Sequence, residues 1–528
     1  MKQQTEKQPI RSLPQNICSL GMVVLLLCTL FIGLFLAYYS LRYSYYSTVQ
    51  YAGPVVLIKD NTFANLAVFT GAVLVSWLLQ RTFDKYIQNQ RLAGYIFLGL
   101  CCLIYAVTAL VWVNALPYYP SGDQLNTTAA AFYHLDGNFS MLTEGGYLGK
   151  FPYQKGLTFF YEILFTLFGD FCYPIAAKTH IIMGIITFIA GYLLVEETSW
   201  NNIGKIIYCP LFLCCVPYLI LTPYAYGDLP SICFCTILFL ALLRFARTNL
   251  WRYIPLACVS AALALLFRLH TWIVLIAVII GLVLCALQKK KLAPILAGIL
   301  IITSAVGASK ALDYSYYLRS GIPNTQGLPM ILSLAMGMQD NYGGPGAYNN
   351  YQTTVMSSVN FDRDAATEIA KENLRENFEH FANDPAYAKW FFKTKLTMQW
   401  TEPSFEALLS THSFDEELPM PQWIWDIYYG DSHNPILNFA DRYQSLIYFG
   451  YLFFVPVLWR KRKENAASYI PLIAIVGGFL FSIVWEAQCR YVLPYYMFML
   501  LYVPDGILYV QQTICKLILR IRNPKCTP

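Results

Sequence analysis

Residues 17–38 read ICSLGMVVLLLCTLFIGLFLAY, a run of 22 residues without a charge. A helix needs about 20 apolar residues to cross the hydrocarbon core of a bilayer. The run is too long for the core of a signal peptide, and no small-x-small cleavage site ends it. It therefore predicts a first membrane-spanning helix that the chain retains.

The rest of the chain has the same apolar character. Of its 528 residues, 57% are hydrophobic and 13% are charged, whereas ordinary soluble domains carry about 25% charged residues. Disordered and nucleic-acid-binding chains carry more charge still, so both classes are excluded and no nucleic-acid partner is expected. The composition predicts an all-α polytopic membrane protein, with the lipid bilayer as its surroundings.

Eleven further apolar stretches follow the first one. The candidate spans are 17–39, 63–80, 92–115, 174–195, 206–222, 229–247, 253–268, 271–287, 292–311, 443–459, 467–485 and 490–510. The clear basic clusters are Arg81/Lys85/Arg91, Arg244/Arg247/Arg252, Lys289–Lys291, Arg460–Lys463 and Lys516/Arg520/Arg522. Because cytoplasmic loops are enriched in Lys and Arg, we expect these clusters and the N-terminus in the cytoplasm. This gives a consistent alternation of about twelve transmembrane helices.

The alternation has one condition, which concerns residues 156–170. This apolar stretch must not cross the membrane. It is short and is flanked by Gly156 and Gly169. Since a spanning helix needs about 20 residues, we expect a re-entrant or in-plane helix here.

The alternation also divides the chain into three parts. Residues 1–312 form an N-terminal transmembrane module that includes a first extracytoplasmic loop, 116–155. Residues 313–440 form an extracytoplasmic segment of mixed, mainly helical structure, which holds 16 of the 31 acidic residues of the chain and no cysteine. Residues 441–528 carry the C-terminal transmembrane helices and a cytoplasmic tail.

One helix of the extracytoplasmic segment has a clear start signal, Asn383-Asp384-Pro385, with Asp at the cap and Pro in the first turn. Residues 386–400 then read AYAKWFFKTKLTMQW. Their mixture of aromatic and basic residues favours an amphipathic helix at the bilayer surface. A helix packed on the rest of the extracytoplasmic segment is the alternative.

The first extracytoplasmic loop holds an unusual carboxylate. Asp123 follows Pro120-Ser121-Gly122 directly after the third span. A carboxylate at the membrane surface is a candidate general base. It is equally a candidate helix N-cap, because Asp is a favoured cap and residues 125–134 have a helical pattern. Both roles are compatible with each other.

Other ionisable residues stand in the same loop. Lys150 and Lys155 flank Phe151-Pro152-Tyr153-Gln154 at the membrane edge, where two cations suit a phosphate group. The alternative is that they are only solvated, which is the usual fate of an interfacial lysine. Glu144 precedes the flexible pair Gly145-Gly146.

Three more corners on the same side carry charges beside apolar spans. They end in Tyr226-Gly227-Asp228, Arg268-Leu269-His270 and Glu486-Ala487-Gln488-Cys489-Arg490-Tyr491. An ionisable residue at such a depth indicates a functional site. Arg268 has no partner in its own segment and is the better anion-binding candidate. Glu486 and Arg490 are four residues apart, so on a helix they could simply pair with each other.

Motifs for cofactors are absent from the sequence. There is no P-loop, no GxGxxG after a strand, no HExxH and no Cys/His spacing typical of zinc. We therefore predict no cofactor, and no ligand cluster argues for a divalent metal. Any group transfer would need a pre-activated substrate that is already in the membrane.

Three stretches of the sequence have a family resemblance. The first is SGDQ (121–124) followed by GKFPYQKGLTFFYEILFTLFGD (149–170). The second is MGMQDNYGGPGAYNNY (336–351) followed by NDPAYAKWFFKTKLTMQWTEPSF (383–405). The third is EAQCRYVLPYY (486–496). Together they resemble the GT-C membrane glycosyltransferases, and most closely the bacterial members of glycosyltransferase family 39, which are similar to dolichyl-phosphate-mannose–protein mannosyltransferases.

The resemblance implies a GT-C-like fold and an inverting transferase. The donor would be a sugar linked to a polyprenyl phosphate, and the acceptor an envelope glycan, lipid or protein. Asp123 would deprotonate the acceptor hydroxyl, and Lys155, Arg268 and Arg490 would hold the lipid phosphate as it leaves. The chain has Asp123-Gln124 where many relatives have Asp-Glu, and a second carboxylate would then come from Glu144 or Asp136 if the loop folds back.

The full expectation is a multi-pass enzyme of the bacterial plasma membrane whose active face is extracytoplasmic. Asp123 is the candidate catalytic residue. The candidate substrate-binding residues are Gln124, Glu144, Lys150, Tyr153, Lys155, Asp228, Arg268, His270, Arg490 and Tyr491. Two alternatives remain open. A transporter or flippase of lipid-linked saccharide would need polar groups along a path through spans that are nearly all apolar, and a non-catalytic membrane scaffold would not need Asp123.

Overall fold

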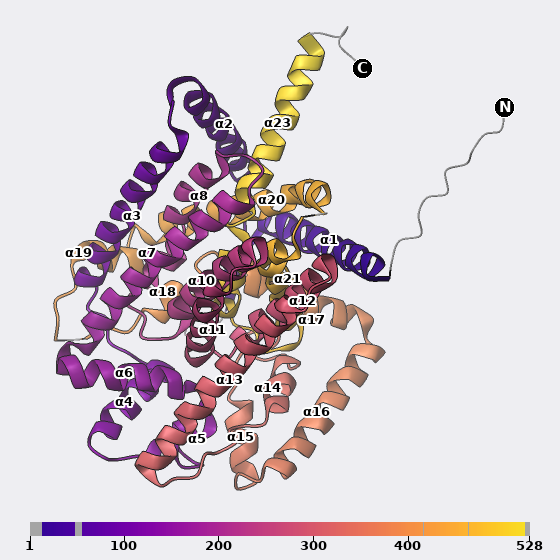
Figure 1. The fold of residues 1–528 in the computed structure, drawn as a ribbon. Coiled ribbons are helices and arrows are strands. Elements are labelled where there is room, and N and C mark those ends of the chain that lie inside the picture. Colours follow the sequence, from indigo (N-terminus) through magenta and orange to yellow (C-terminus); the bar gives the residue numbers. More distant parts are fainter. Residues whose placement is uncertain (1–12, 48–54, 416, 463, 523–528) are drawn as a thin grey trace.

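Long apolar helices make up most of the structure, a computed structural model that describes residues 13–47, 55–415, 417–462 and 464–522 (Figure 1). Eight helices in this part of the chain are long and apolar enough to cross a membrane. They are α1 (Leu13–Ser40), α2 (Thr62–Tyr86), α3 (Gln90–Ala115), α7 (Cys172–Thr198), α10 (Asp228–Thr248), α12 (Thr271–Lys289), α13 (Ala293–Ser320) and η6–α21 (Ala466–Tyr469 and Ile470–Val484). The chain is therefore a multi-pass integral membrane protein, as its composition predicts.

A ninth span is added if one pair of helices with a bend between them is counted as a single span. Residues Cys489–Met499, which comprise η7 (Cys489–Val492) and α22 (Leu493–Met499), meet α23 (Val503–Arg522) at an angle of 53°. The other expected spans fall on α8 (Gly204–Leu213) with α9 (Val216–Ile220), on η5 (Trp251–Tyr253) with α11 (Ile254–Phe267), and on α20 (His433–Lys461). The first two are short or broken and α20 is more polar, so the count of twelve stays a prediction.

The expected span 206–222 is not a continuous helix. It breaks at Cys214 and Cys215, between α8 and α9. Pro217 explains the break, because proline lacks the N–H that would bond to the Leu213 carbonyl and its ring clashes with that carbonyl in a continuous helix.

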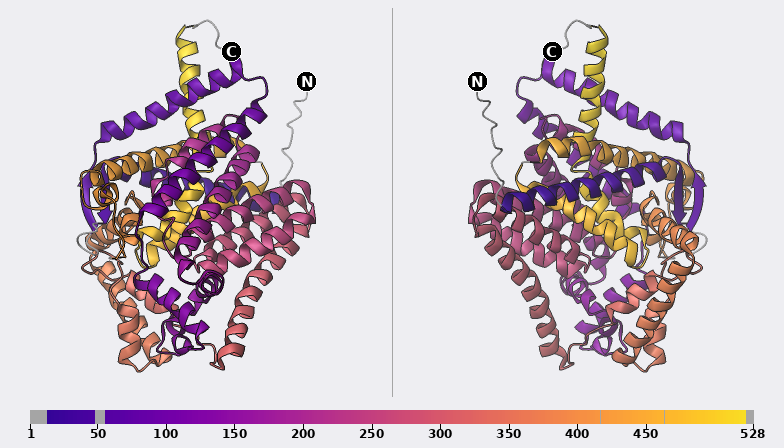
Figure 2. Two further views of the ribbon diagram at one scale, coloured as in Figure 1. Left: turned by 90° about the vertical axis from the view of Figure 1, so that its left-hand side faces the viewer. Right: turned by 90° about the vertical axis from the view of Figure 1, so that its right-hand side faces the viewer.

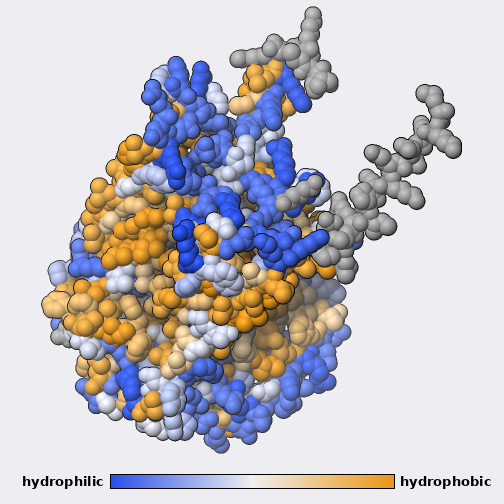
Figure 3. Space-filling view, viewed as in Figure 1, coloured by the Kyte–Doolittle hydropathy of each residue, from blue (hydrophilic) through white to orange (hydrophobic). Residues whose placement is uncertain are grey.

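Burial separates the central helices from the peripheral ones. In an apolar stretch of 18 residues, 78% of the residues of α10 are buried inside the protein, whereas only 22% are buried in the corresponding stretches of α2 and α13. The exposed side chains of the peripheral helices are largely apolar, as contact with lipid requires. Figure 3 shows the result on one face, with hydrophobic residues across the middle and hydrophilic residues toward the upper and lower ends.

The described residues of the five basic clusters gather at one end of the molecule, called here the basic end. Arg244 binds Glu197 at the end of α7, Lys461 donates to the Thr198 carbonyl, and Lys289 contacts Asn249. The α2–α3 turn and the C-terminal part of α23 lie at this end in Figure 1. The opposite end, called here the loop end, carries residues 116–171 and most of residues 321–432, and Figure 2 shows its segments 116–171 and 321–383 toward the bottom of both views.

The stretch 156–170 forms α6 (Lys155–Phe168), which packs against α4 (Gly122–Leu135) at the loop end. Its 14 residues span about 21 Å, less than the hydrocarbon thickness of about 30 Å. In Figure 1 it runs across the direction of α7. These features agree with the in-plane helix that its length predicts.

Both expected boundaries of the extracytoplasmic segment, 313 and 440, fall inside helices. Position 313 lies inside α13, which continues to Ser320, and position 440 lies inside α20, which begins at His433. Both helices extend past their apolar parts because polar contacts at the loop end support them. The helices between are α14 (Met330–Gly337), α15 (Tyr351–Ser358), α16 (Arg363–Asn383), α17 (Pro385–Trp400), α18 (Ala407–Ser410) and α19 (Gln422–Tyr428).

Helix α17 joins two hydrophobic cores. Phe391 belongs to a small core formed with α14, α15 and α16, while Trp400 belongs to the main core of the transmembrane helices. Lys395 is fully buried between them. The packed alternative is therefore seen in the structure, whereas contact of α17 with a bilayer surface stays a prediction. Periodicity did not reveal this, because the two ends of α17 bury side chains against different neighbours.

A short antiparallel hairpin, which sequence patterns did not predict, connects α1 and α2. Its strands are β1 (Tyr43–Ser47) and β2 (Val55–Lys59), with Tyr43 opposite Lys59 and Ser47 opposite Val55. The Tyr45 amide donates to the Thr401 carbonyl, so the hairpin is fixed to the end of α17. At its base the Ser44 hydroxyl lies 2.9 Å from an Asp60 carboxylate oxygen and 2.6 Å from one of Asp441.

Candidate active site

Two buried arginines and one buried aspartate form the centre of the loop end. Asp228 begins α10, Arg268 follows α11, and Arg490 lies in η7. Arg268 Nη2 lies 3.3 Å from Asp228 Oδ1, and Arg490 Nε lies 3.7 Å from Asp228 Oδ2. All three side chains are at least nine-tenths buried. This group, called here the arginine cluster, brings together three corners that are far apart in the sequence.

The arginine cluster is loosely paired. Within the described residues, both Asp228 oxygens and the Nε atoms of Arg268 and Arg490 have no hydrogen-bond partner. Two guanidiniums against one carboxylate leave one positive charge uncompensated. A buried charge without a close partner is costly, so the arrangement is suited to an anionic ligand that completes these contacts.

Tyrosines from one turn hold the two guanidiniums. Arg268 lies 4.7 Å from the ring centre of Tyr226, and Arg490 lies 4.9 Å from that of Tyr224, both in cation–π geometry. Arg490 also donates to the Tyr224 hydroxyl and, at 3.2 Å, to Ser410 Oγ. A Cβ on Gly227 would lie 2.2 Å from the Phe267 carbonyl oxygen. Glycine therefore allows this turn to approach the end of α11, which brings the Tyr226 ring against the Arg268 guanidinium.

The same tyrosines anchor the first loop. Gln124 Nε2 donates to the Tyr224 hydroxyl at 2.5 Å, and Gln154 donates to the Tyr226 hydroxyl. Gln124 is thus a structural link between α4 and the arginine cluster. Tyr224, Tyr226, Gln154 and Ser410 were not among the sequence-based candidates, since uncharged residues give no signal until the fold brings them to the arginines.

Asp123 lies in the first turn of α4, with an exposed side chain. The N-cap of this helix is Ser121, whose amide is bound by Gln124 Oε1 at 3.2 Å. The N-cap interpretation of Asp123 is therefore wrong, and its carboxylate is free for other contacts. It forms a hydrogen bond with Tyr147 and acts electrostatically on Tyr153, Tyr226 and Glu486. The pKa of Tyr147 is raised well above its usual value by burial and by the acidic and tyrosine side chains around it.

Glu486 is the second carboxylate beside Asp123. It is buried, with 8% of its surface exposed. Burial and the neighbouring Asp123 raise its pKa to about 7, while Arg490 acts in the opposite direction. The alternative that Glu486 pairs with Arg490 along a helix is wrong, because the chain is not helical between α21 and η7 and Arg490 pairs with Asp228.

The lysines of the first loop lie away from the arginine cluster. The Lys155 ammonium is buried and binds Asp313 Oδ1 at 3.0 Å and Asn324 Oδ1 at 2.8 Å. Lys150 lies 6.0 Å from the ring centre of Phe361. Lys155 thus contacts α13 and the segment after it, Lys150 contacts that segment alone, and the arginines are left as the cations of the candidate site.

The remaining candidates surround this centre at different depths. The Arg268 guanidinium lies 5.5 Å from the ring centre of Tyr491. The side chain of Tyr153 is 42% exposed. His270 is half-buried, and burial together with Arg268 lowers its pKa well below the usual value, so it is neutral. Glu144 and Asp136 are exposed, and Asp136 ends α4 about 20 Å along the helix from Asp123. In the described part of the chain, no group of three His, Cys, Asp or Glu side chains could hold a metal ion.

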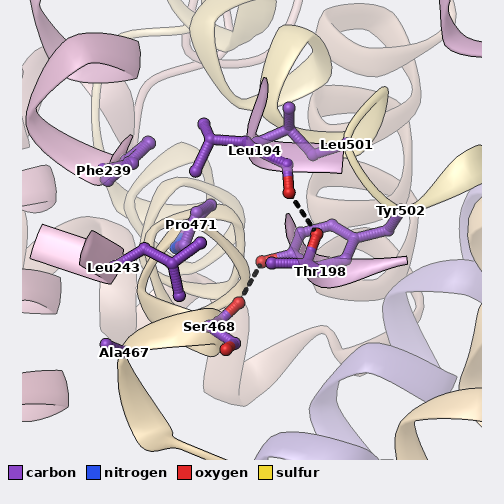
Figure 4. A pocket seen from close by; sticks show the side chains of 9 residues that line it. All are labelled: Leu194, Thr198, Phe239, Leu243, Ala467, Ser468, Pro471, Leu501 and Tyr502. Atoms are coloured by element: carbon purple, nitrogen blue, oxygen red, sulfur yellow. Dashed lines mark hydrogen bonds between the residues drawn. The ribbon is translucent and has the colours of Figure 1, made fainter. Parts of the chain in front are cut away.

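A pocket lies near the basic end, away from the arginine cluster (Figure 4). It is lined by Leu194, Thr198, Phe239, Leu243, Ala467, Ser468, Pro471, Leu501 and Tyr502. Leu243 follows Asp228 by 15 positions on α10, or about 22 Å of helix. No acid or base lines this pocket, so it does not offer the chemistry of the loop end.

No protein-family model and no curated protein matches the chain.

Proposed function

We propose that the chain is a membrane glycosyltransferase that moves a sugar from a polyprenyl-phosphate-linked donor to a hydroxyl group of a cell-envelope acceptor. One observation carries the proposal. An exposed carboxylate, Asp123, acts electrostatically on Tyr226, and so do two buried guanidiniums, Arg268 and Arg490, that lack a full set of anionic partners. A general base next to an anion site is what transfer from a phosphate-linked donor requires.

In this reaction Asp123 takes the proton of the acceptor hydroxyl. The acceptor oxygen attacks the anomeric carbon of the donor sugar from the side opposite the phosphate. The bond between the anomeric carbon and the phosphate oxygen breaks, and the polyprenyl phosphate leaves with the bonding electron pair. A single displacement of this kind inverts the anomeric centre.

The arginine cluster stabilises the leaving group. Negative charge develops on the phosphate as the bond breaks, and preorganised cations in a buried site stabilise such charge far better than water-exposed ones. Arg268 directly follows the apolar helix α11, at the depth where a lipid headgroup lies when its chains are in the bilayer. The uncompensated positive charge of the cluster supports the same role.

The charge distribution supports an extracytoplasmic active face. The described residues of the five basic clusters lie at the basic end, and Lys and Arg are enriched in cytoplasmic loops. The loop end, with 16 acidic residues in positions 313–440, is then outside. We place the reaction there, in the plasma membrane of a bacterium, with an envelope glycan, lipid or protein as acceptor.

The test is a transfer assay with the purified protein in lipid vesicles and a panel of radiolabelled polyprenyl-phosphate sugars. The wild type should consume one donor, and Asp123→Asn should be slower by about a hundredfold or more, because general bases contribute 10²–10⁴-fold. Asp136→Asn is the matched control, an exposed aspartate at the other end of the same helix.

Two other outcomes would change the proposal. Equal rates for the wild type and Asp123→Asn would keep the transferase but remove Asp123 as its base. If the folded wild type consumed none of the donors but still bound and translocated a lipid-linked saccharide, the protein would be a transporter or flippase.

A further inference from the structure

Glu486 has no partner that explains its burial. The side chain is 8% exposed, and in the described part of the chain its carboxylate makes no hydrogen bond and no ion pair. Other buried acids of the loop end are satisfied. Glu402, for example, accepts from Ser404 Oγ and from the Glu406 amide, each at 2.7 Å. The Glu486 oxygens are not among the fully buried polar atoms that lack a partner, so they are open to solvent, and Glu486 is placed for a contact with something outside the chain.

The backbone around Glu486 is fixed by the glycine-rich stretch 337–346. The Ala487 amide donates to the Gly346 carbonyl at 2.7 Å. A Cβ on Gly337 would lie 2.6 Å from the backbone of Trp485, and one on Gly346 would lie 2.7 Å from Lys395 Cε. Only glycine allows this close packing, which holds the connection between α21 and η7 in one position.

Lys395 lies behind the same connection but does not neutralise Glu486. Its ammonium is fully buried and donates to the Gly337 carbonyl at 2.5 Å. No ion pair joins Lys395 to Glu486 among the described residues, although the two groups interact electrostatically. Lys395 therefore supports the glycine-rich stretch and leaves the Glu486 carboxylate free.

Glu486 faces Asp123 and the arginine cluster. The charged and titratable groups around it come from α4, η3 (Pro152–Gln154), the end of α11, the stretch before α15, α17, the residue before α18, and η7. They are Asp123, Tyr153, Arg268, Tyr348, Lys395, Glu406, Arg490 and Tyr491. Glu486 and Asp123 thus interact electrostatically within one group of residues, although 363 positions separate them in the chain.

We propose that Glu486 is the second carboxyl group of the active site, which binds the acceptor hydroxyl opposite Asp123 and shares the proton that this hydroxyl loses. The inference rests on the proposed glycosyl transfer. The acceptor O–H bond breaks as the new bond to the anomeric carbon forms, the phosphate leaves with its electron pair, and the proton stays between the two carboxylates. A pKa near 7 suits Glu486 to hold that proton at neutral pH.

The first experiment compares Glu486→Gln and Glu486→Asp with the wild type in the transfer assay. Glu486→Gln should lower kcat at least tenfold with little change in the KM for the donor, and Glu486→Asp should recover part of kcat. The pH profile of kcat/KM should lose one ionisation near pH 7 in Glu486→Gln. Glu376→Gln, an exposed glutamate on α16, is the control and should match the wild type.

The second experiment measures melting temperature against pH and needs no activity. The folded pKa of Glu486 is about 7, above the 4.5 of a free glutamate. The folded state then binds the extra proton, and stability falls as pH rises from about 5 to 8. Glu486→Gln should lack this fall and melt higher than the wild type at pH 8. Glu376→Gln should follow the wild type at every pH.

The outcomes separate the inference from the proposed function. If the wild type is active and Glu486→Gln has the same kcat and the same pH profile, Glu486 is not part of the site. A lower melting temperature for Glu486→Gln at every pH would show that the carboxylate is structural and would also overturn the inference. A wild type that consumes no donor overturns the proposed function, and the inference falls with it.

Discussion

The Arg268 guanidinium lies 3.3 Å from the Asp228 carboxylate, and both groups are buried. Arg490 approaches the other oxygen of the same carboxylate at 3.7 Å. Asp228 is thus the only acid within ion-pair distance of either arginine in the described residues. Asp228 stabilises the loop end because it pairs with both arginines. For the same reason it lowers the affinity of the loop end for other anions.

Asp228→Asn should destabilise the protein and strengthen its response to anions. Removing one partner of a buried ion pair typically costs about 3–5 kcal/mol, because the other charge is left unpaired. Added inorganic phosphate should recover part of the loss, since it can take the place of the carboxylate. The measurement is the melting temperature with and without phosphate, with Asp136→Asn as the exposed control. A variant that melts like the wild type would contradict the ion-pair role.

Arg490→Lys should lower kcat/KM for the lipid-linked donor by about a hundredfold, because loss of one charge-stabilising donor costs about 10²–10³-fold. Lysine keeps the charge but cannot contact Tyr224, Ser410 and Asp228 at once as the guanidinium does. Steady-state kinetics with varied donor checks this. Arg375→Lys, on the exposed face of α16, should behave as the wild type, and equal effects of the two substitutions would refute the role of Arg490.

Tyr316→Phe should destabilise the contact between α13 and α6 by about 1–2 kcal/mol, the usual range for a lost buried hydrogen bond. The Tyr316 hydroxyl donates to Glu162 Oε1 at 2.7 Å, and Arg319 and His134 bind the same carboxylate at 2.7 and 2.6 Å. Chemical denaturation in detergent measures the change. The neighbouring residue gives the control, because Tyr317 is 44% exposed and Tyr317→Phe should have no effect.

Lys395→Met should stabilise the protein most at pH 7 and below. Burial lowers the pKa of Lys395 to about 7 from 10.5. Between these two values the unfolded chain binds a proton that the folded chain does not, so wild-type stability rises with pH in this interval. The advantage of the variant should therefore shrink from pH 7 to pH 10. Lys393→Met, two residues earlier on α17 and exposed, should show no such trend in melting temperature.

Sequence patterns predict those features of this protein that depend only on neighbouring residues in the chain. The apolar helices follow from hydropathy, and the charged corners at Asp228, Arg268 and Arg490 were recognised because each adjoins an apolar span. Their shared position at the loop end follows from the alternation of spans. What the patterns could not predict is which corner contacts which, since Asp228 and Arg490 are separated by 262 positions.

Three misjudged residues show the same limit. Lys155 was expected at a phosphate, but its partner Asp313 comes from a helix 158 positions later. Glu486 was paired with Arg490 by helical spacing, although the chain is extended between α21 and η7. Asp123 has the residue type of an N-cap, but Ser121 two positions earlier fills that role. In each case a tertiary contact or a local break decided the outcome.

The two halves of the candidate site are made at different times. Asp123 and Arg490 are 367 positions apart in the chain, which corresponds to roughly 20–70 s of synthesis at about 5–20 residues per second. During this interval the nascent chain carries the carboxylate without Arg490, Glu486 or the helices that bury them. The candidate site is thus complete only after the last helices have entered the membrane, and a chain that stops early lacks the arginine cluster.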